Sequence, residues 1–184
     1  IIFFAGLFIM IHGLEYMGLI NAIADGISDT ISQADESNRL MVAVLLLLWV
    51  SAIASAFIDN IPYTATMVPV VIELASDPEL GLALGPLAWA LALGACLGGN
   101  GTIIGASANV VAAGLAEEAG YDISFNRFFK TGFPIMILTV TLATAYCVVR
   151  YAIEWSNDII PMAIIAAMML ASVSLTPMIY GPAP

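Results

Sequence analysis

Positive charge is scarce in this chain of 184 residues, which has four Lys and Arg residues in total against 14 Asp and Glu residues. The resulting net charge of −10 argues against a nucleic-acid partner and against a basic surface that binds anionic lipids. Cysteine is also scarce, and the two that occur, Cys96 and Cys147, both lie in apolar runs. We therefore interpret them as small packing residues and not as a disulfide or a metal-binding pair.

Charge of either sign makes up only 10% of the chain, well below the roughly 25% of a soluble domain. Uncharged apolar stretches of about 18 or more residues are long enough to cross a bilayer as helices. With 61% hydrophobic residues and a mean hydropathy of +1.02, the composition predicts an all-α, multi-pass integral membrane protein. A large soluble helical core would need polar helix faces, which these stretches lack. The uncharged stretches are 40–58, 80–116, 131–149 and all residues after Asp158.

A polar cluster interrupts the apolar region 40–75, where Asp59 and Asn60 are followed by Pro62. The apolar piece after this break, residues 63–75, is about 20 Å long as a helix. That length is too short to cross roughly 30 Å of hydrocarbon. We therefore expect 40–75 to form a re-entrant hairpin, which enters and leaves the membrane on one side. Before it, the sequence predicts a span over 1–20 and a polar loop over 21–38.

A second break is predicted within the apolar region 81–116, which is too long for one helix and contains "GACLGGNGTIIG". Its glycines are expected to unwind the chain, leaving two half-helices, about 81–97 and 103–116. An alternative interpretation is close helix packing, because Gly94 and Gly98, like Gly101 and Gly105, have the spacing of a packing motif. After a polar loop at 117–127, two more spans are predicted, at 128–150 and 159–179.

Both breaks carry polar side chains at a depth where irregular backbone is tolerated only if protein or a water-filled cavity satisfies it. Paired broken helices are how many transporters build a binding site, and amide and hydroxyl oxygens suit a hard ion such as Na⁺. An acid at this depth is usually functional, which directs attention to Asp59. The candidate ion- or substrate-binding residues are Asp59, Asn60, Thr64, Asn100, Gly101, Thr102, Ser107 and Asn109, with Asp59, Asn60, Asn100 and Thr102 as candidate Na⁺ ligands.

A further pair of polar residues, His12 and Glu15, lies three positions apart on one face of the first predicted span. The spacing fits a proton relay, and it fits equally a polar contact between helices or a position near the membrane surface. The residues alone leave these interpretations open.

Several long motifs resemble a known group of membrane proteins. These are "DNIPYTATMVPV", "GACLGGNGTIIGASANVVAAGLAEEAGY", "FFAGLFIMI", "VSAIASAFIDNIP" and "FFKTGFPIMI". Together they cover roughly residues 1–155. They are similar to the ion transporter superfamily, which includes arsenite-pump, citrate-transporter and Na⁺/H⁺ antiporter-like proteins, and within it to the melanosomal P protein-like members.

The resemblance implies a fold of two inverted repeats, each with a re-entrant hairpin and a broken helix, assembled as a homodimer. By that comparison this chain is the second, C-terminal repeat of a larger transport domain, and the N-terminal repeat is missing. Carboxylate-transporting relatives have a Ser-Asn-Thr type hairpin tip, whereas this chain has Asp59 at the first position. The difference favours a cation or a proton there over a dicarboxylate. The segment 159–179 has no counterpart in the resemblance.

The function expected from these features is secondary active transport of a small anion or other small solute, coupled to Na⁺ or H⁺ and requiring no cofactor. The membrane would be that of an organelle, melanosome-like, or the plasma membrane. The alternatives are an ion channel or anion conductance that regulates organelle pH, and a non-transporting assembly subunit. A membrane-embedded enzyme is not expected, because an aspartyl protease needs two facing carboxylates and no Gly-x-Ser-x-Gly elbow occurs.

Overall fold

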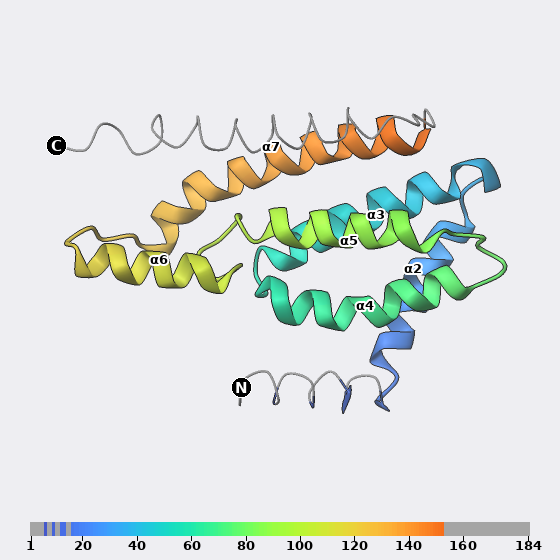
Figure 1. Ribbon diagram of the computed structural model, residues 1–184, viewed down its shortest axis with the longest axis horizontal. Coiled ribbons are helices and arrows are strands. Elements are labelled where there is room, and N and C mark those ends of the chain that lie inside the picture. Colours follow the sequence, from blue (N-terminus) through green and yellow to red (C-terminus); the bar gives the residue numbers. More distant parts are fainter. Residues whose placement is uncertain (1–5, 7–8, 10–11, 14–15, 153–184) are drawn as a thin grey trace.

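The computed structural model describes residues 6, 9, 12–13 and 16–152, and all regular elements within these ranges are helical (Figure 1). The predicted all-α class is therefore confirmed. Most of the predicted span 1–20 and the whole of 159–179 lie outside the described residues. The helices are α2 (Leu19–Ser32), η1 (Glu36–Asn38), α3 (Arg39–Ser55), α4 (Asn60–Ser76), α5 (Leu84–Gly98), α6 (Ser107–Glu118) and α7 (Phe125–Ala152).

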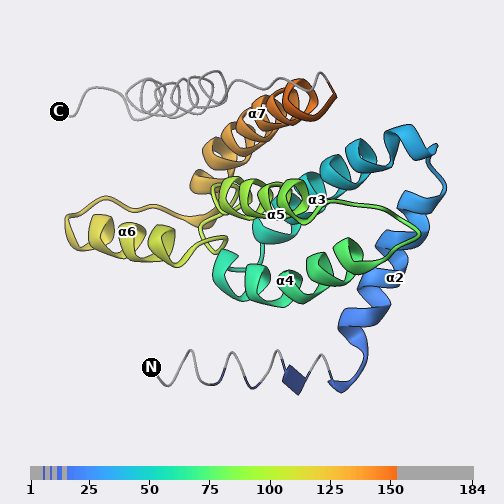
Figure 2. The same cartoon turned by 45° about the vertical axis from the view of Figure 1, so that its right-hand side comes forward.

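The centre of the molecule is the pair α3 and α5, which pack along each other. Helix α4 packs on α5, α7 covers α3 and α5, and α2 contacts α4 and α3 at one end (Figures 1 and 2). Helix α6 continues away from this group, and none of its residues is buried. The arrangement leaves two non-helical interruptions: the first interruption, residues 56–59 between α3 and α4, and the second interruption, residues 99–106 between α5 and α6.

The close approach of α3 and α5 depends on glycine. A Cβ atom on Gly94 would overlap the carbonyl of Leu48, and one on Gly98 would lie 2.7 Å from the Cα of Ala52. Ser55 adds a hydrogen bond across the same interface, donating from Oγ to the carbonyl of Ala95 at 2.8 Å. The packing interpretation of Gly94 and Gly98 is confirmed.

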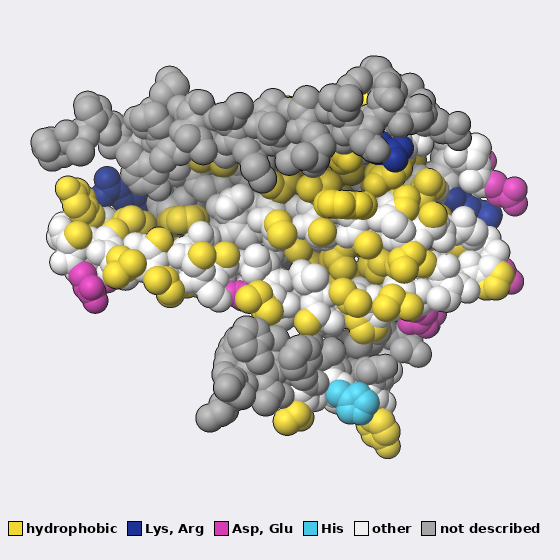
Figure 3. Space-filling view, in the orientation of Figure 1, with side chains coloured by type: hydrophobic (Ala, Val, Ile, Leu, Met, Phe, Trp, Pro, Cys, Tyr) yellow, Lys and Arg dark blue, Asp and Glu magenta, His cyan; other side chains and the backbone are white. Residues whose placement is uncertain are grey.

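The outer surface is rich in apolar side chains. The segments Glu36–Ser55 and Phe125–Tyr151 are long and apolar enough to cross a membrane, and Leu84–Gly98 is a shorter apolar helix. Yellow apolar side chains spread across the middle of Figure 3, while most coloured charges lie toward its two ends. Exposed apolar area of this extent is unusual for a soluble protein and fits contact with lipid. The large exposed side chains include Val50, Ile53, Phe57, Val68, Ile72 and Trp89.

The prediction of a polar loop over 21–38 was wrong, because this region contains most of α2 and the whole of η1. Asp25 and Asp29 are exposed, whereas Ala24 and Ile31 are buried. Their spacing is that of an amphipathic helix with one apolar face, and the acids on its other face were mistaken for a loop signal.

Both interruptions also differ in position from the predicted breaks at 59–62 and 98–102. Pro62 lies inside the first turn of α4, where its missing N–H has no intrahelical partner to lose. Helix α6 begins at Ser107 and not at residue 103. The Thr102 hydroxyl accepts a hydrogen bond from the Gly105 N–H at 3.1 Å, a local bond that competes with helix formation.

Candidate functional site

Asp59 ends the first interruption and begins α4. It has extended backbone, with φ −49° and ψ 135°, and its Oδ1 accepts a hydrogen bond from the N–H of Ile61 at 3.0 Å. This is the geometry of an N-cap, in which a side-chain oxygen satisfies one of the unpaired N–H groups of the first helical turn. The carboxylate is thereby held at the start of α4.

The second interruption is held by its own turns and by the side chain of Asn109. The N–H of Gly101 bonds to the carbonyl of Gly98 at 2.8 Å, which closes a turn directly after α5. From α6, Asn109 donates through Nδ2 to the carbonyl of Gly99 at 2.8 Å and to that of Thr102 at 3.1 Å. One amide group thus ties both parts of the interruption to α6.

The glycines of the second interruption are required by proximity and not by unusual backbone angles. Among the described residues, positive φ angles occur at other glycines. A Cβ on Gly101 would lie 2.7 Å from the Sδ of Met136, and one on Gly105 would lie 2.9 Å from the carbonyl oxygen of Ala56. A side chain at Gly105 would therefore push the second interruption away from the backbone of the first, whereas one at Gly101 would require the Met136 side chain and the Cβ of Ala56 to shift.

Two side-chain hydrogen bonds join the first interruption to the second interruption and to the first residue of α6. The Thr102 hydroxyl donates to the carbonyl of Ala56, and the Ser107 hydroxyl donates to Oδ2 of Asp59. Residues more than 40 positions apart in the chain are therefore brought together at one place.

The other predicted site residues have uncommitted side chains. Within the described part of the chain, Asn60, Thr64 and Asn100 make no side-chain hydrogen bond to another residue. Asn60 and Thr64 are half-buried and four positions apart on α4, so they lie on one face of that helix. Asn100 is exposed, and its carbonyl oxygen lies near Gly132 of α7.

The charge of Asp59 is balanced by helix ends. Asp59 caps α4, and its partner Ser107 is the first residue of α6, so the partial positive ends of two helices meet at one carboxylate. In the described residues an ion pair links Arg39 and Glu36 at 3.9 Å, and none involves Asp59. In the described part of the chain, the groups beside this carboxylate are therefore helix ends and a hydroxyl and not a basic side chain.

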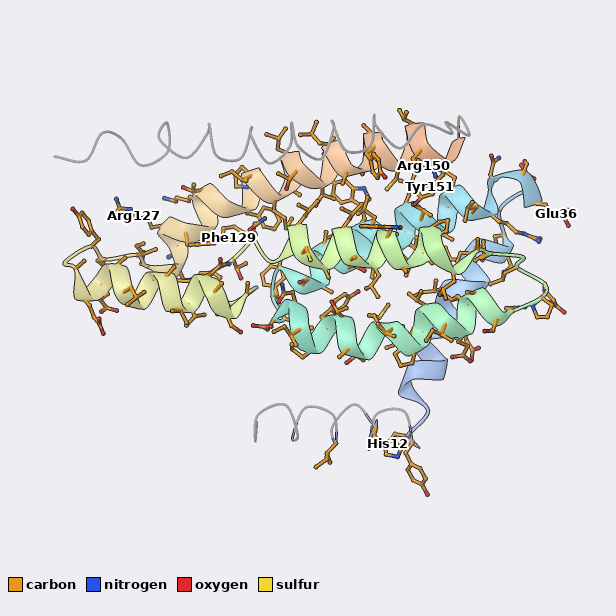
Figure 4. The ribbon with its side chains drawn as sticks, in the orientation of Figure 1. His12, Glu36, Arg127, Phe129, Arg150 and Tyr151 are labelled. Atoms are coloured by element: carbon orange, nitrogen blue, oxygen red, sulfur yellow. The ribbon has the colours of Figure 1, made fainter. Side chains whose placement is uncertain are left out.

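Sequence reasoning missed the groups on neighbouring elements that complete the site, namely the carbonyl of Ala56 and residues Gly132 and Met136 of α7. A signal was present in the small residues at 94, 98, 101 and 105, whose spacing of three and four marks one continuous packing face. His12 lies beyond the start of α2 in Figure 4, and Glu15 is outside the described residues, so the relay between them stays a prediction.

Comparison with known proteins identifies relatives over most of the chain. The citrate transporter family matches residues 1–94. The human P protein is 50% identical over 157 residues, 85% of this chain and 19% of that protein. A 46 kDa membrane protein of Mycobacterium leprae is 42% identical over 153 residues, and an uncharacterized transporter of Mycobacterium tuberculosis, Rv2684, is 42% identical over 151 residues. No solved structure matches.

Its long apolar helices and these matches place the chain in a family of membrane proteins. The chain belongs to the citrate transporter family. The resemblance to P protein-like members of the ion transporter superfamily is confirmed by the matches to the human, pig and mouse P proteins. The chain spans about a fifth of the length of those proteins and about a third of the mycobacterial ones.

Proposed function

We propose that this chain forms the solute-binding part of a secondary active transporter that is coupled to Na⁺ or H⁺. The observation that carries the proposal is the position of Asp59, whose carboxylate lies where the two interruptions meet. Family membership supports transport and not catalysis as the activity.

In this proposal α3 and α4 form a re-entrant hairpin and α5 and α6 form a broken membrane helix. With 17 residues, α4 is about 25 Å long, while α6, with 12 residues, is about 18 Å long. Both are shorter than the roughly 30 Å hydrocarbon layer. Figure 4 places Glu36 and Arg150 toward one end of the molecule and Arg127 toward the other, as expected for charges at two membrane faces.

The proposed ligands are side-chain oxygen atoms of the two interruptions and of the first turn of α4. The carboxylate of Asp59 with the side-chain oxygens of Asn60 and Asn100 suits Na⁺, and the carboxylate alone suits a proton. Thr64 extends this polar face along α4, and the positive ends of α4 and α6 favour a small anion nearby. The hydrogen bonds and contacts of the remaining predicted residues support assigning them to the same proposed site: Gly101, Thr102, Ser107 and Asn109.

Alternating access would come from rocking of this bundle against an N-terminal repeat, in a homodimer within an organellar or plasma membrane. The much greater length of the relatives supports a larger working unit. This assembly is proposed from the family resemblance, with a small ion or small anion as the solute.

The test compares two matched aspartates in the complete protein, reconstituted in vesicles. Asp59→Asn keeps an oxygen that can cap α4 but removes the charge. If Na⁺ is the coupling ion, we expect the half-saturating Na⁺ concentration to rise about tenfold or more, because a charged ligand is lost. If H⁺ is the coupling ion, we expect uptake to lose its response to a pH gradient. Uptake of radioactive Na⁺ and an internal pH dye give the two readouts.

Asp77→Asn is the control, because Asp77 makes the same kind of local bond at the other end of α4, accepting from the N–H of Glu79 at 2.8 Å. It should leave ion dependence unchanged. Wild-type ion dependence in Asp59→Asn would remove this carboxylate from the mechanism, and non-saturable flux without fixed stoichiometry would indicate a channel instead.

A further inference from the structure

We propose that Thr102 is a positioning residue: its hydroxyl fixes the first interruption against the second and does not contact the solute. The inference rests on the proposed function, which makes this place a binding site. It changes the role of a residue whose type and position alone predict a Na⁺ ligand.

The hydroxyl of Thr102 has its partners inside the protein. Its Oγ1 donates to the carbonyl of Ala56 and accepts from the N–H of Gly105 at 3.1 Å. A hydroxyl has one hydrogen to donate and two lone pairs, so the donor is used and one lone pair is filled. Thr102 is 0% exposed, which leaves the remaining lone pair without access to a mobile solute.

The carbonyl of Ala56 needs such a donor. It follows the last turn of α3, where carbonyl groups lack intrahelical partners, and Ala56 is itself 0% exposed. Buried backbone groups of this kind are nearly always paired. Because Gly105 has no side chain, the chain of the second interruption can approach this carbonyl closely enough for Thr102 to reach it.

Asn109 extends the same connection into α6. It donates to the backbone carbonyl of Thr102, whose side chain in turn donates to Ala56. A continuous path of hydrogen bonds therefore runs from α6 through the second interruption to the first, beside the direct bond from Ser107 to Asp59. The polar groups left for a solute are the carboxylate of Asp59 and the uncommitted side chains of Asn60, Thr64 and Asn100.

The test uses three variants of the complete protein in vesicles, with Na⁺ and protons as the transported probes. Thr102→Val keeps the shape of the side chain and removes the hydroxyl, while Thr102→Ser keeps the hydroxyl. Thr139→Val makes the same change at another buried threonine, 7% exposed, whose hydroxyl bonds only to carbonyls of its own helix α7. We expect Thr102→Val to raise the half-saturating ion concentration about tenfold, Thr102→Ser to restore it to within about threefold, and Thr139→Val to match the wild type.

Hydrogen exchange without Na⁺ in the buffer separates positioning from ligation. If Thr102 positions the interruptions, amide exchange in peptides covering 56–59 and 99–106 will be several-fold faster in Thr102→Val, slow again in Thr102→Ser, and unchanged in Thr139→Val. Unchanged exchange at 56–59 in folded Thr102→Val would overturn the inference, as would a Thr102→Ser variant that behaves like Thr102→Val. A wild type without ion-dependent uptake would refute the proposed function, and the exchange result would still decide whether Thr102 joins the interruptions.

Discussion

The two interruptions solve one problem in different ways. Each must satisfy backbone groups where a helix stops among apolar surroundings. The first has four residues and no glycine, and it is closed by the charged cap of Asp59. The second has eight residues, and its three glycines pack against neighbouring backbone and side chains while Asn109 bonds its carbonyls.

This difference indicates that the two interruptions have different roles. The second interruption carries no charge, and the Thr102 side chain and the carbonyls of Gly99 and Thr102 bond inside the protein, so it forms a platform from which the Asn100 side chain is exposed. The first carries the charge, and Asp59 is held by one backbone bond and one hydroxyl bond. In the proposed function Asp59 binds and releases an ion, and such a group has to keep part of its bonding capacity free.

The largest effect is expected from a change that separates the two interruptions by disturbing the packing of α3 against α5. In Gly98→Ala the new Cβ would lie 2.7 Å from the Cα of Ala52, which is backbone and cannot turn aside. We expect a loss of about 3 kcal/mol of stability, the upper end for overpacking, measured by thermal unfolding in detergent. Gly114→Ala in α6 is the control, because nothing lies within 4 Å of its added Cβ and alanine favours helix. Equal melting temperatures for the two variants would contradict the close packing of α3 and α5.

A second change alters only the second interruption, which forms the platform. Asn109→Asp replaces the amide that donates to the carbonyls of Gly99 and Thr102 with a carboxylate that repels both oxygens. We expect destabilisation by about 2 kcal/mol together with loss of ion-dependent uptake. Asn126→Asp provides the same substitution at an exposed site in the first turn of α7, where negative charge is favourable, and it should be neutral or slightly stabilising. A functional Asn109→Asp protein would show that the second interruption does not depend on this side chain.

The smallest effect on stability is expected from a change between α3 and α4, the two helices that the first interruption joins. The Tyr63 hydroxyl of α4 donates to the Oγ of Ser51 on α3 at 3.2 Å, and both residues are buried. Tyr63→Phe should reduce stability by about 1 kcal/mol, because Ser51 is left with an unpaired hydroxyl, while ion affinity changes little. Tyr121→Phe, at a side chain that is 60% exposed, should change neither quantity. A large shift in ion affinity in Tyr63→Phe would mean that the hairpin arms set the site as strongly as its tip.

Much of this arrangement could be predicted from the sequence because its signals are local. An acid three residues before a proline in an apolar run predicts a stop before α4, and a glycine-rich stretch predicts a stop after α5. The same local reasoning failed for α2, where exposed Asp25 and Asp29 concealed an amphipathic helix.

The roles of individual site residues could not be predicted in this way. Asn60 and Asn109 are the same residue type near the start of a helix, yet the first has an uncommitted side chain and the second bonds two carbonyls. Thr64 and Thr102 differ in the same manner. The hydroxyl of Thr102 donates to a residue more than 40 positions away, and Asn109 bonds across the turns of the second interruption, so in both cases the partner depends on how the chain folds back and not on a short sequence pattern.

Helix α6 is anchored at its first turn, through Ser107 and Asn109, and is unsupported by buried residues along its remaining length. Its far end, about 18 Å away, continues through residues 119–124 into α7, so α6 can act as a lever. A push from lipid or from another polypeptide on its far end, near Glu118, would be transmitted as torque to the Ser107 hydroxyl and from there to the carboxylate of Asp59.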